Sequence, residues 1–302
     1  MEVDHQSTME RPQPVQALGG QPHGAGIKSI LVHVQDDRSV DRRVEAALSI
    51  ARACNAHLSC LHVTPVEAYV AFDGFGGVFV MSDVMQAIDD EARQIRTRIE
   101  GDLRGEDVAW DYAEVTGNVR NRIIAHAALS DLIVTGRDPH KAQFPGSSLG
   151  TLGDLLHRSR TPLFIPGDEG PPADPTGAAI VAWDGSYEAA NAVRASLGLL
   201  KMASDVRVIQ VEEEKDEAFP RTKLLEYLSR HGIHAELTVE RCEGKRPDRD
   251  AIVFSLLGHV EQARAGYIVM GGYNHTRLGE YLFGGVTRTL LASSPVGLLI
   301  AH

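Results

Sequence analysis

The chain contains the same pattern of segments twice. An apolar segment opens each half, at residues 30–34 (Ile-Leu-Val-His-Val) and at residues 180–183 (Ile-Val-Ala-Trp). Each half closes on a short apolar segment that follows a proline, at Leu163–Ile165 and at Leu298–Ile300. Because a repeat of about 140 residues has the length of one domain, the pattern indicates a duplicated domain rather than a solenoid of short units.

Within each half, segments typical of strands alternate with segments typical of helices. Residues 27–34 are almost continuously apolar, as in a strand that is buried on both faces. The next apolar residues follow a helical period, and Asn55 stands where a helix would end in a left-handed cap. Such alternation predicts a parallel sheet covered on both faces. We therefore predict an α/β fold of two tandem Rossmann-like domains, each a five-stranded parallel sheet with helices on both faces.

Composition sets the predicted domain boundaries. Residues 1–26 are polar and rich in Gln, Pro and Gly, which predicts a disordered tail. The first domain is predicted at 27–166 and the second at 178–302. Residues 167–177 form a linker by their Gly, Pro and Asp content.

Net charge, apolar stretches and cysteine content argue against a nucleic-acid-binding, membrane-spanning or secreted protein. The net charge of -11 argues against nucleic-acid binding through phosphate neutralisation. No apolar stretch reaches the roughly 18 residues of a membrane span, and the N-terminus has no apolar core of a secretory signal. Three cysteines without a CxxC pair suit a reducing compartment. We expect a cytoplasmic protein with no nucleic-acid or membrane partner.

Two glycine clusters in the second half have the spacing of a ligand-binding loop. Gly271-Gly272-Tyr273-Asn274 follows the fourth predicted strand, and Gly284-Gly285-Val286-Thr287-Arg288 begins a predicted helix. Glycines let the backbone approach a ligand closely, and a helix N-terminus favours a phosphate group. The alternative is that these glycines only make tight turns.

Together with Asp-Gly-Ser at 184–186, these clusters resemble the universal stress protein family in its tandem form. The resemblance covers residues 27–302 and is stronger in the second half. It implies an adenine-nucleotide site in some members, in which an Asp after the first strand holds the base and the glycine motif with a Ser or Thr holds the phosphates. Asp184 occupies the Asp position, Asn274 stands in place of the middle glycine, and Gly285 stands in place of the hydroxyl residue.

The first half departs further from the family pattern. Gln35 occupies the Asp position, and Arg137-Asp138-Pro139 interrupts the motif after Gly136. Proline cannot donate a backbone amide to phosphate. We therefore predict that the first half binds no nucleotide in the family's mode.

The resemblance implies a second-half site for ATP or AMP that is weak or absent, with no metal beyond the Mg²⁺ that accompanies a nucleotide. No Walker lysine motif, HExxH or GxSxG sequence appears, so no catalytic residue is predicted and an enzymatic role stays open. The predicted site residues are Ala182, Trp183, Asp184, Val211, Met270, Gly271, Gly272, Asn274, Gly284, Gly285, Val286 and Thr287.

Two further features admit two interpretations each. Cys54, His57, Cys60 and His62 are close in sequence, as in a metal site, but buried free cysteine is the commoner explanation. Residues 66–80 combine aromatic residues with glycines. This insertion is either a lid or docking patch, or a loop that packs on its own domain.

The leading hypothesis is a stress-response module that binds and signals. The alternatives are a slow ATPase and a ligand-free structural protein that dimerises. Because each closing strand would otherwise leave an open sheet edge, we expect the two halves to pair as an intramolecular pseudo-dimer. Homo-oligomerisation stays open.

Overall fold

The computed structural model describes residues 26–65, 71–72, 78–79, 82–137, 147–167, 170, 172–212, 221–241, 248–272 and 283–302. The first half contains β1 (Ser29–Val34), α1 (Val40–Cys54), β2 (His57–Pro65), β3 (Ala71–Phe72), β4 (Val78–Phe79), α2 (Ser82–Leu103), β5 (Trp110–Gly117), α3 (Val119–His126), a 3₁₀ turn (Ala127–Leu129), β6 (Leu132–Val134), α4 (Ser147–Ser159) and β7 (Leu163–Ile165). The second half contains β8 (Ala178–Ala182), α5 (Tyr187–Leu200), β9 (Asp205–Glu212), α6 (Arg221–Arg230), β10 (Glu236–Arg241), α7 (Arg249–Ala263), β11 (Tyr267–Gly271), α8 (Gly285–Ser293) and β12 (Gly297–Ala301).

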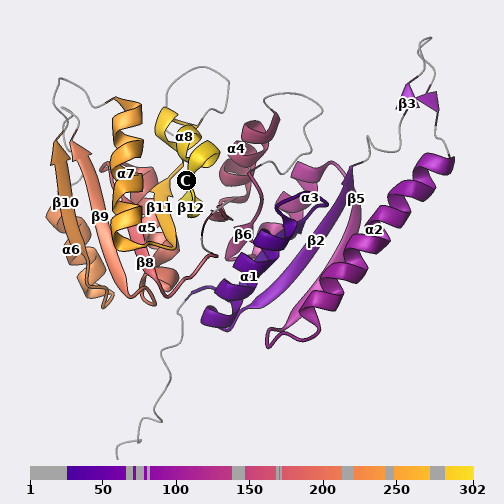
Figure 1. The fold of residues 1–302 in the computed structure, drawn as a ribbon, viewed down its shortest axis with the longest axis horizontal. Helices are drawn as coiled ribbons and strands as arrows, with labels where there is room; N and C mark the ends of the chain where they lie inside the picture. The colour runs from indigo at the N-terminus through magenta and orange to yellow at the C-terminus, as the bar shows by residue number, and fades with distance from the viewer. Residues whose placement is uncertain are drawn as a thin grey trace, which may run out of the picture.

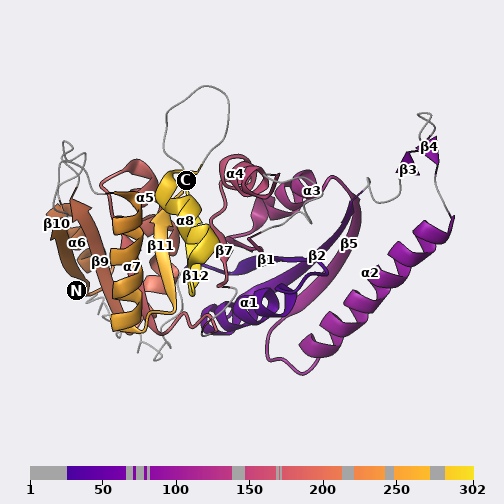
Figure 2. The same cartoon turned by 45° about the horizontal axis from the view of Figure 1, so that its top comes forward.

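Ten strands form one continuous sheet, in the order β10-β9-β8-β11-β12-β7-β6-β1-β2-β5 (Figure 1). The five strands of each half are parallel to one another, as the apolar runs predicted. The halves meet at β7 and β12, which pair antiparallel with Phe164 opposite Leu299. Figure 2 shows these two strands side by side at the centre of the molecule. We call this junction the seam.

Helices cover both faces of the sheet, which confirms the predicted fold class. One buried cluster joins residues of α1, α2, α5 and α6 to one face of the strands. The other cluster joins residues of α3, α4, α7 and α8 to the opposite face. Both clusters run across the seam, so the two halves share one layered core.

Local sequence explains where the first helix ends. Asn55 adopts the left-handed conformation expected of it, with φ 49° and ψ 56°. Its backbone N–H bonds the carbonyls of Ala51 and Arg52, which satisfies two acceptors at the end of α1. The chain can therefore turn directly into β2.

The insertion contributes a small antiparallel pair, β3 with β4. Both views place this pair beyond the N-terminal end of α2, away from the ten-stranded sheet (Figures 1 and 2). The remaining residues of the insertion, the tail at 1–25 and linker residues 168, 169 and 171 lie outside the described residues.

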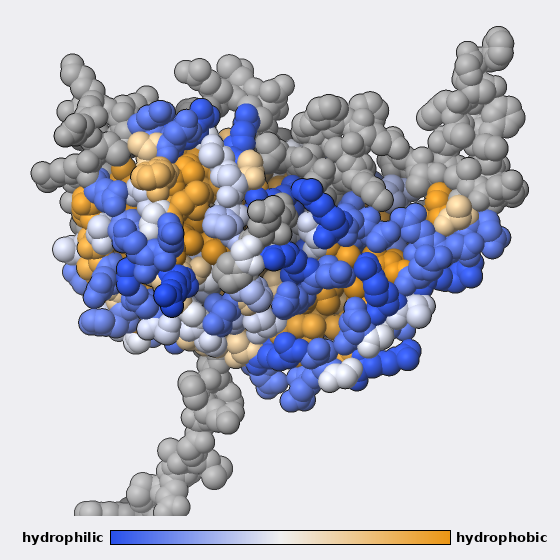
Figure 3. Space-filling view, viewed as in Figure 1, coloured by the Kyte–Doolittle hydropathy of each residue, from blue (hydrophilic) through white to orange (hydrophobic). Residues whose placement is uncertain are grey.

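The visible surface is mostly hydrophilic, with one apolar area between α1 and α2 and another in the region of α7 (Figure 3). Val108, Trp110 and Tyr112 are only partly buried against the core on this face. Within the described ranges, no helix has the length and apolar character to cross a membrane.

Candidate functional site

The second half has its switch point between β8 and β11, because the chain leaves β8 toward β9 on one side and returns as β11 on the other. In sheets of this kind, ligands bind at the carboxyl ends of the strands beside such a point. Ala182 and Met270 are paired there in register. Both side chains pack with the cluster under α7 and α8, so the predicted site faces those two helices.

Trp183 was predicted to line this site, but its side chain lies in the opposite layer. The indole is 5% exposed and belongs to the cluster that includes α5. The backbone N–H of Trp183 bonds the carbonyl of Ile209. Because successive strand residues point to opposite faces, Ala182 and Trp183 cannot both face α7. Trp183 can therefore reach the predicted site only through its backbone.

Asp184 is exposed at the end of β8. Its Oδ1 atom accepts a hydrogen bond from the Ser186 backbone N–H at 2.9 Å. The Ser186 hydroxyl in turn accepts from the Ala189 N–H at 3.1 Å and caps α5. Gly185 between them has φ 75°, a conformation that favours glycine. The Asp-Gly-Ser motif thus builds the start of a helix and leaves the carboxylate at the surface.

Gly271 and Gly272 are required by packing. A Cβ atom at position 271 would lie 2.6 Å from the Ala189 backbone nitrogen, because the first turn of α5 crosses the end of β11. A Cβ atom at position 272 would collide with Ile300 and lie 3.1 Å from Leu156 of the first half. Packing against α5, Ile300 and Leu156 thus requires a residue without a side chain at positions 271 and 272, and the choice between a ligand loop and simple tight turns stays open.

Gly271→Ala should lower the free energy of unfolding by about 1–3 kcal/mol, since the added methyl group meets backbone that cannot rotate away. Gly258→Ala in α7 is the matched control, because nothing lies within 4 Å of its Cβ position. That control should gain about 0.5–1 kcal/mol from helix propensity. Urea denaturation of both variants tests the difference, and equal stabilities would contradict the packing explanation.

The second glycine cluster has a different environment. Gly284 is the N-cap of α8 and, as a glycine, has no side chain to cap the helix with a hydrogen bond. No atom lies within 4 Å of the point that a Cβ atom at this position would occupy. Val286 is half-buried and Thr287 is 5% exposed. The first backbone N–H groups of a helix have no acceptor within the helix, so those of α8 are available to an acceptor outside it. Val211 is also half-buried, in β9. Asn274 lies outside the described residues.

Arg249 is a neighbour of this cluster that no sequence pattern predicts. It is the first residue of α7, and its Cδ atom lies 2.6 Å from the Cβ position of Gly285. No motif marks it, because it precedes the glycine cluster by a whole helix and strand. Only the packing of α7 beside α8 brings it to the predicted site.

In the first half, Arg43 of α1 lies at the carboxyl ends of β1 and β6, on the face of the sheet that α1 covers. Its side chain is 2% exposed, and Nε donates to the His33 carbonyl at 3.0 Å while Nη2 donates to the Gln35 carbonyl at 3.0 Å. Nη1 donates to both carboxylate oxygens of Asp37. A Cβ atom on Gly136 would lie 2.7 Å from this Nη1. Arg43 thus fills the space that the start of α5 fills beside Gly271.

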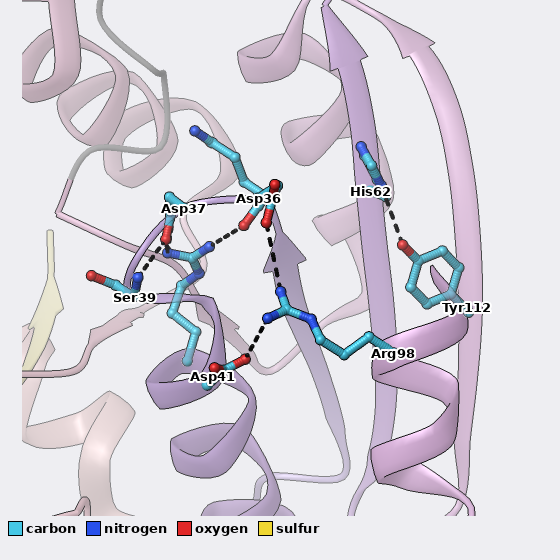
Figure 4. Close-up of polar contacts among 9 residues, drawn as sticks. Asp36, Asp37, Ser39, Asp41, His62, Arg98 and Tyr112 are labelled. Carbon is cyan, nitrogen blue, oxygen red and sulfur yellow. Dashed lines mark hydrogen bonds and ion pairs between the residues drawn. The ribbon is translucent and has the colours of Figure 1, made fainter. Parts of the chain in front are cut away.

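Ion pairs also join the loop after β1 and the start of α1 to α2 (Figure 4). Arg98 of α2 reaches Asp36 and Asp41 at 3.6 and 3.4 Å, which links α2 to α1 and its preceding loop. His62 Nδ1 lies 3.2 Å from the Tyr112 hydroxyl. Burial lowers the pKa of His62 and raises the pKa of Tyr112. The carboxyl end of the first half is therefore occupied by its own polar side chains on this face.

The candidate metal residues have no metal-site geometry. Burial raises the pKa of Cys54 to about 11 and that of Cys60 to about 12, which keeps both thiols protonated near neutral pH. The His57 ring bonds Asp111 at 2.6 Å. Within the described ranges, no three His, Cys, Asp or Glu side chains converge on one point.

A shallow pocket of about 590 Å³ lies at the opposite end of the strands, around the start of β2. Its walls include Lys28, Arg52 and Glu106, and Arg52 forms an ion pair with Glu106 across it. Since ligands of open parallel sheets bind at the carboxyl ends, this pocket is not the predicted site.

The sequence matches no protein-family model and no curated protein. Solved structures do match. A universal stress protein from Archaeoglobus fulgidus is 16% identical with a TM-score of 0.67, over 90% of this chain and 97% of that one. A functionally unknown protein from Pseudomonas aeruginosa PAO1 is 18% identical with a TM-score of 0.56, over 92% and 93%. Over nearly its whole length, the chain has the fold of the universal stress protein from Archaeoglobus fulgidus.

Proposed function

We propose that the chain is a tandem universal stress protein whose second half binds an adenine nucleotide and whose first half serves as its structural partner. The observation that supports this division is the difference between the residues that follow the first strand of each half. In the first half, the neutral Gln35 stands there, and the buried Arg43 side chain bonds its carbonyl and the Asp37 carboxylate. In the second half, the Asp184 carboxylate is exposed and the start of α8 carries no side-chain cap.

The residues of the second half have distinct roles in this proposal. Asp184 accepts a hydrogen bond from the adenine amino group. Ala182 and Met270 provide apolar contact for the base, since both lie near the ends of neighbouring strands on the α7 side. Val211 adds to this contact, because it lies two residues after Ile209 of β9, whose side chain is on the same side. The first amides of α8 face the phosphates, where the positive end of the helix dipole stabilises an anion. Binding, with turnover near background, is the expected activity, because hydrolysis also requires a positioned water and a group that stabilises charge on the terminal phosphate.

Asp184→Ala should weaken ATP binding by about 1.5–3 kcal/mol, the usual contribution of a hydrogen bond to a charged group. Isothermal titration calorimetry of the wild type and the variant measures this loss. Asp184→Asn is the informative companion variant, because an amide oxygen can still accept from the Ser186 N–H while the charge is lost. It should therefore keep the start of α5 and lose part of the affinity.

Gln35→Ala serves as the control at the corresponding position of the first half. We expect it to leave ATP affinity unchanged. Two equivalent sites per chain, or a loss of affinity in Gln35→Ala as large as in Asp184→Ala, would contradict the assignment to the second half.

A further inference from the structure

Arg249 crosses the beginning of α8. Its Cδ atom lies 2.6 Å, and its Nη1 atom 3.4 Å, from the point that a Cβ atom of Gly285 would occupy. A real Cβ atom is not found as close as 2.6 Å to a neighbouring carbon, so any side chain at position 285 would displace Arg249. Arg249 can therefore lie here only because residue 285 is a glycine and has no side chain.

The Arg249 guanidinium is available to a ligand. Its side chain is 55% exposed, and Asp250 lies 3.6 Å away with its own side chain 74% exposed. An exposed ion pair of this length contributes little, so Asp250 does not compete strongly with a bound anion. A guanidinium also presents paired N–H donors that match the oxygens of a phosphate group.

The N-termini of α7 and α8, which lie beside Arg249, also favour the binding of an anion. Asp248, the N-cap of α7, makes no side-chain cap, and neither does Gly284 of α8. The two helices pack against each other, so their first amides and Arg249 lie at one end of one helix pair. Each helix start carries a partial positive charge that favours an anion.

We propose that Arg249 binds the phosphate groups of the nucleotide, so that the site selects adenosine 5′-phosphates over adenosine. This inference rests on the proposed function and identifies the ligand class of the same site. Arg249 supplies the phosphate contact that the family resemblance assigns to a hydroxyl residue at position 285, and Gly285 makes room for it. A serine side chain at position 285 would need the space in which the Arg249 side chain lies.

Calorimetric titration with ATP, AMP and adenosine tests this in the full chain. The wild type should bind ATP more tightly than adenosine. Arg249→Gln should weaken ATP binding about 10- to 150-fold, the equivalent of a charge-assisted hydrogen bond, and leave adenosine binding unchanged. Arg249→Lys should restore part of the ATP affinity, because a point charge replaces the paired donors.

Gly285→Ser tests the role of the glycine. It should weaken ATP binding although it adds a hydroxyl group, because it displaces Arg249. Arg230→Gln in α6 removes the same charge from an exposed side chain on the other face of the sheet, and it should leave all three affinities unchanged. Thermal melting of each variant checks that the fold is retained.

The outcomes separate the two proposals. Binding of adenosine and ATP with equal affinity, both lost in Asp184→Ala, would overturn the role of Arg249 and leave the proposed function standing. An ATP loss in Arg249→Gln no larger than in Arg230→Gln, or tighter ATP binding in Gly285→Ser, would also overturn it. If no adenine compound binds the wild type, both proposals fail.

Discussion

Arg43→Met should lower the free energy of unfolding by about 3–5 kcal/mol, the usual cost of removing one partner of a buried ion pair. Methionine keeps much of the volume of Arg43 but donates no hydrogen bonds. Its introduction leaves the Asp37 carboxylate, which is 21% exposed, without its guanidinium. The carbonyls of His33 and Gln35 lose the donors Nε and Nη2. Urea denaturation followed by circular dichroism should show a lower midpoint with an unchanged m-value.

Arg52→Met is the matched control for that variant. Arg52 also forms an ion pair, with Glu106, but its side chain is 46% exposed. An exposed pair contributes only about 0–1 kcal/mol, so this variant should unfold close to the wild type. If Arg43→Met were no less stable than Arg52→Met, the hydrogen bonds of the Arg43 guanidinium to Asp37 and to the His33 and Gln35 carbonyls would not contribute to stability.

Phe164→Ala should cost about 3–5 kcal/mol, because it removes a fully buried ring from the seam. Phe164 is 1% exposed, lies opposite Leu299 of β12 and contacts the Tyr267 ring at 6.5 Å between centroids. A Cβ atom on Gly297 would touch this ring, at 3.0 Å from Cε1, so the ring occupies the space above the glycine. Loss of the ring leaves a cavity between the two halves.

The thermal transition of Phe164→Ala should remain single, since the core cluster that contains Phe164 also includes α1 of one half and α5 of the other. Leu129→Ala is the control, because Leu129 is 92% exposed and its truncation should change stability by no more than about 0.5 kcal/mol. Two separate transitions in calorimetry, one for each half, would contradict a core shared across the seam.

Regular patterns in the sequence predicted the fold well. Apolar runs predicted the parallel strands, and Asn55 predicted the end of α1, because both depend on interactions between residues close in the chain. The direction of the Trp183 side chain was not predicted, since a motif match carries no information on which face of a strand a residue points to. Burial and alternation decide that, and they place the indole under α5.

Side chains that fill space between packed elements were missed altogether. Arg43 lies beside Gly136 where the start of α5 lies beside Gly271, and α1 begins five residues after Gln35, whereas α5 begins three residues after Asp184. This two-residue difference shifts the helix start, and no local pattern shows what then fills the space. Arg249 was missed for the same reason, as the packing of α7 against α8 and not the chain brings it to Gly285.

The antiparallel seam has an evolutionary consequence. If two identical chains met through β7 and β12, any substitution would appear on both sides of the junction at once. Because both strands belong to one polypeptide, the pairing is intramolecular and each half meets a fixed, non-identical companion at any protein concentration. A substitution in one half therefore leaves the other half unchanged, and the two halves do differ: Arg43 bonds Asp37 in the first half, whereas the Asp184 carboxylate of the second half is exposed. Covalent linkage thus permits the two sides of one junction to change independently, which two identical chains cannot do.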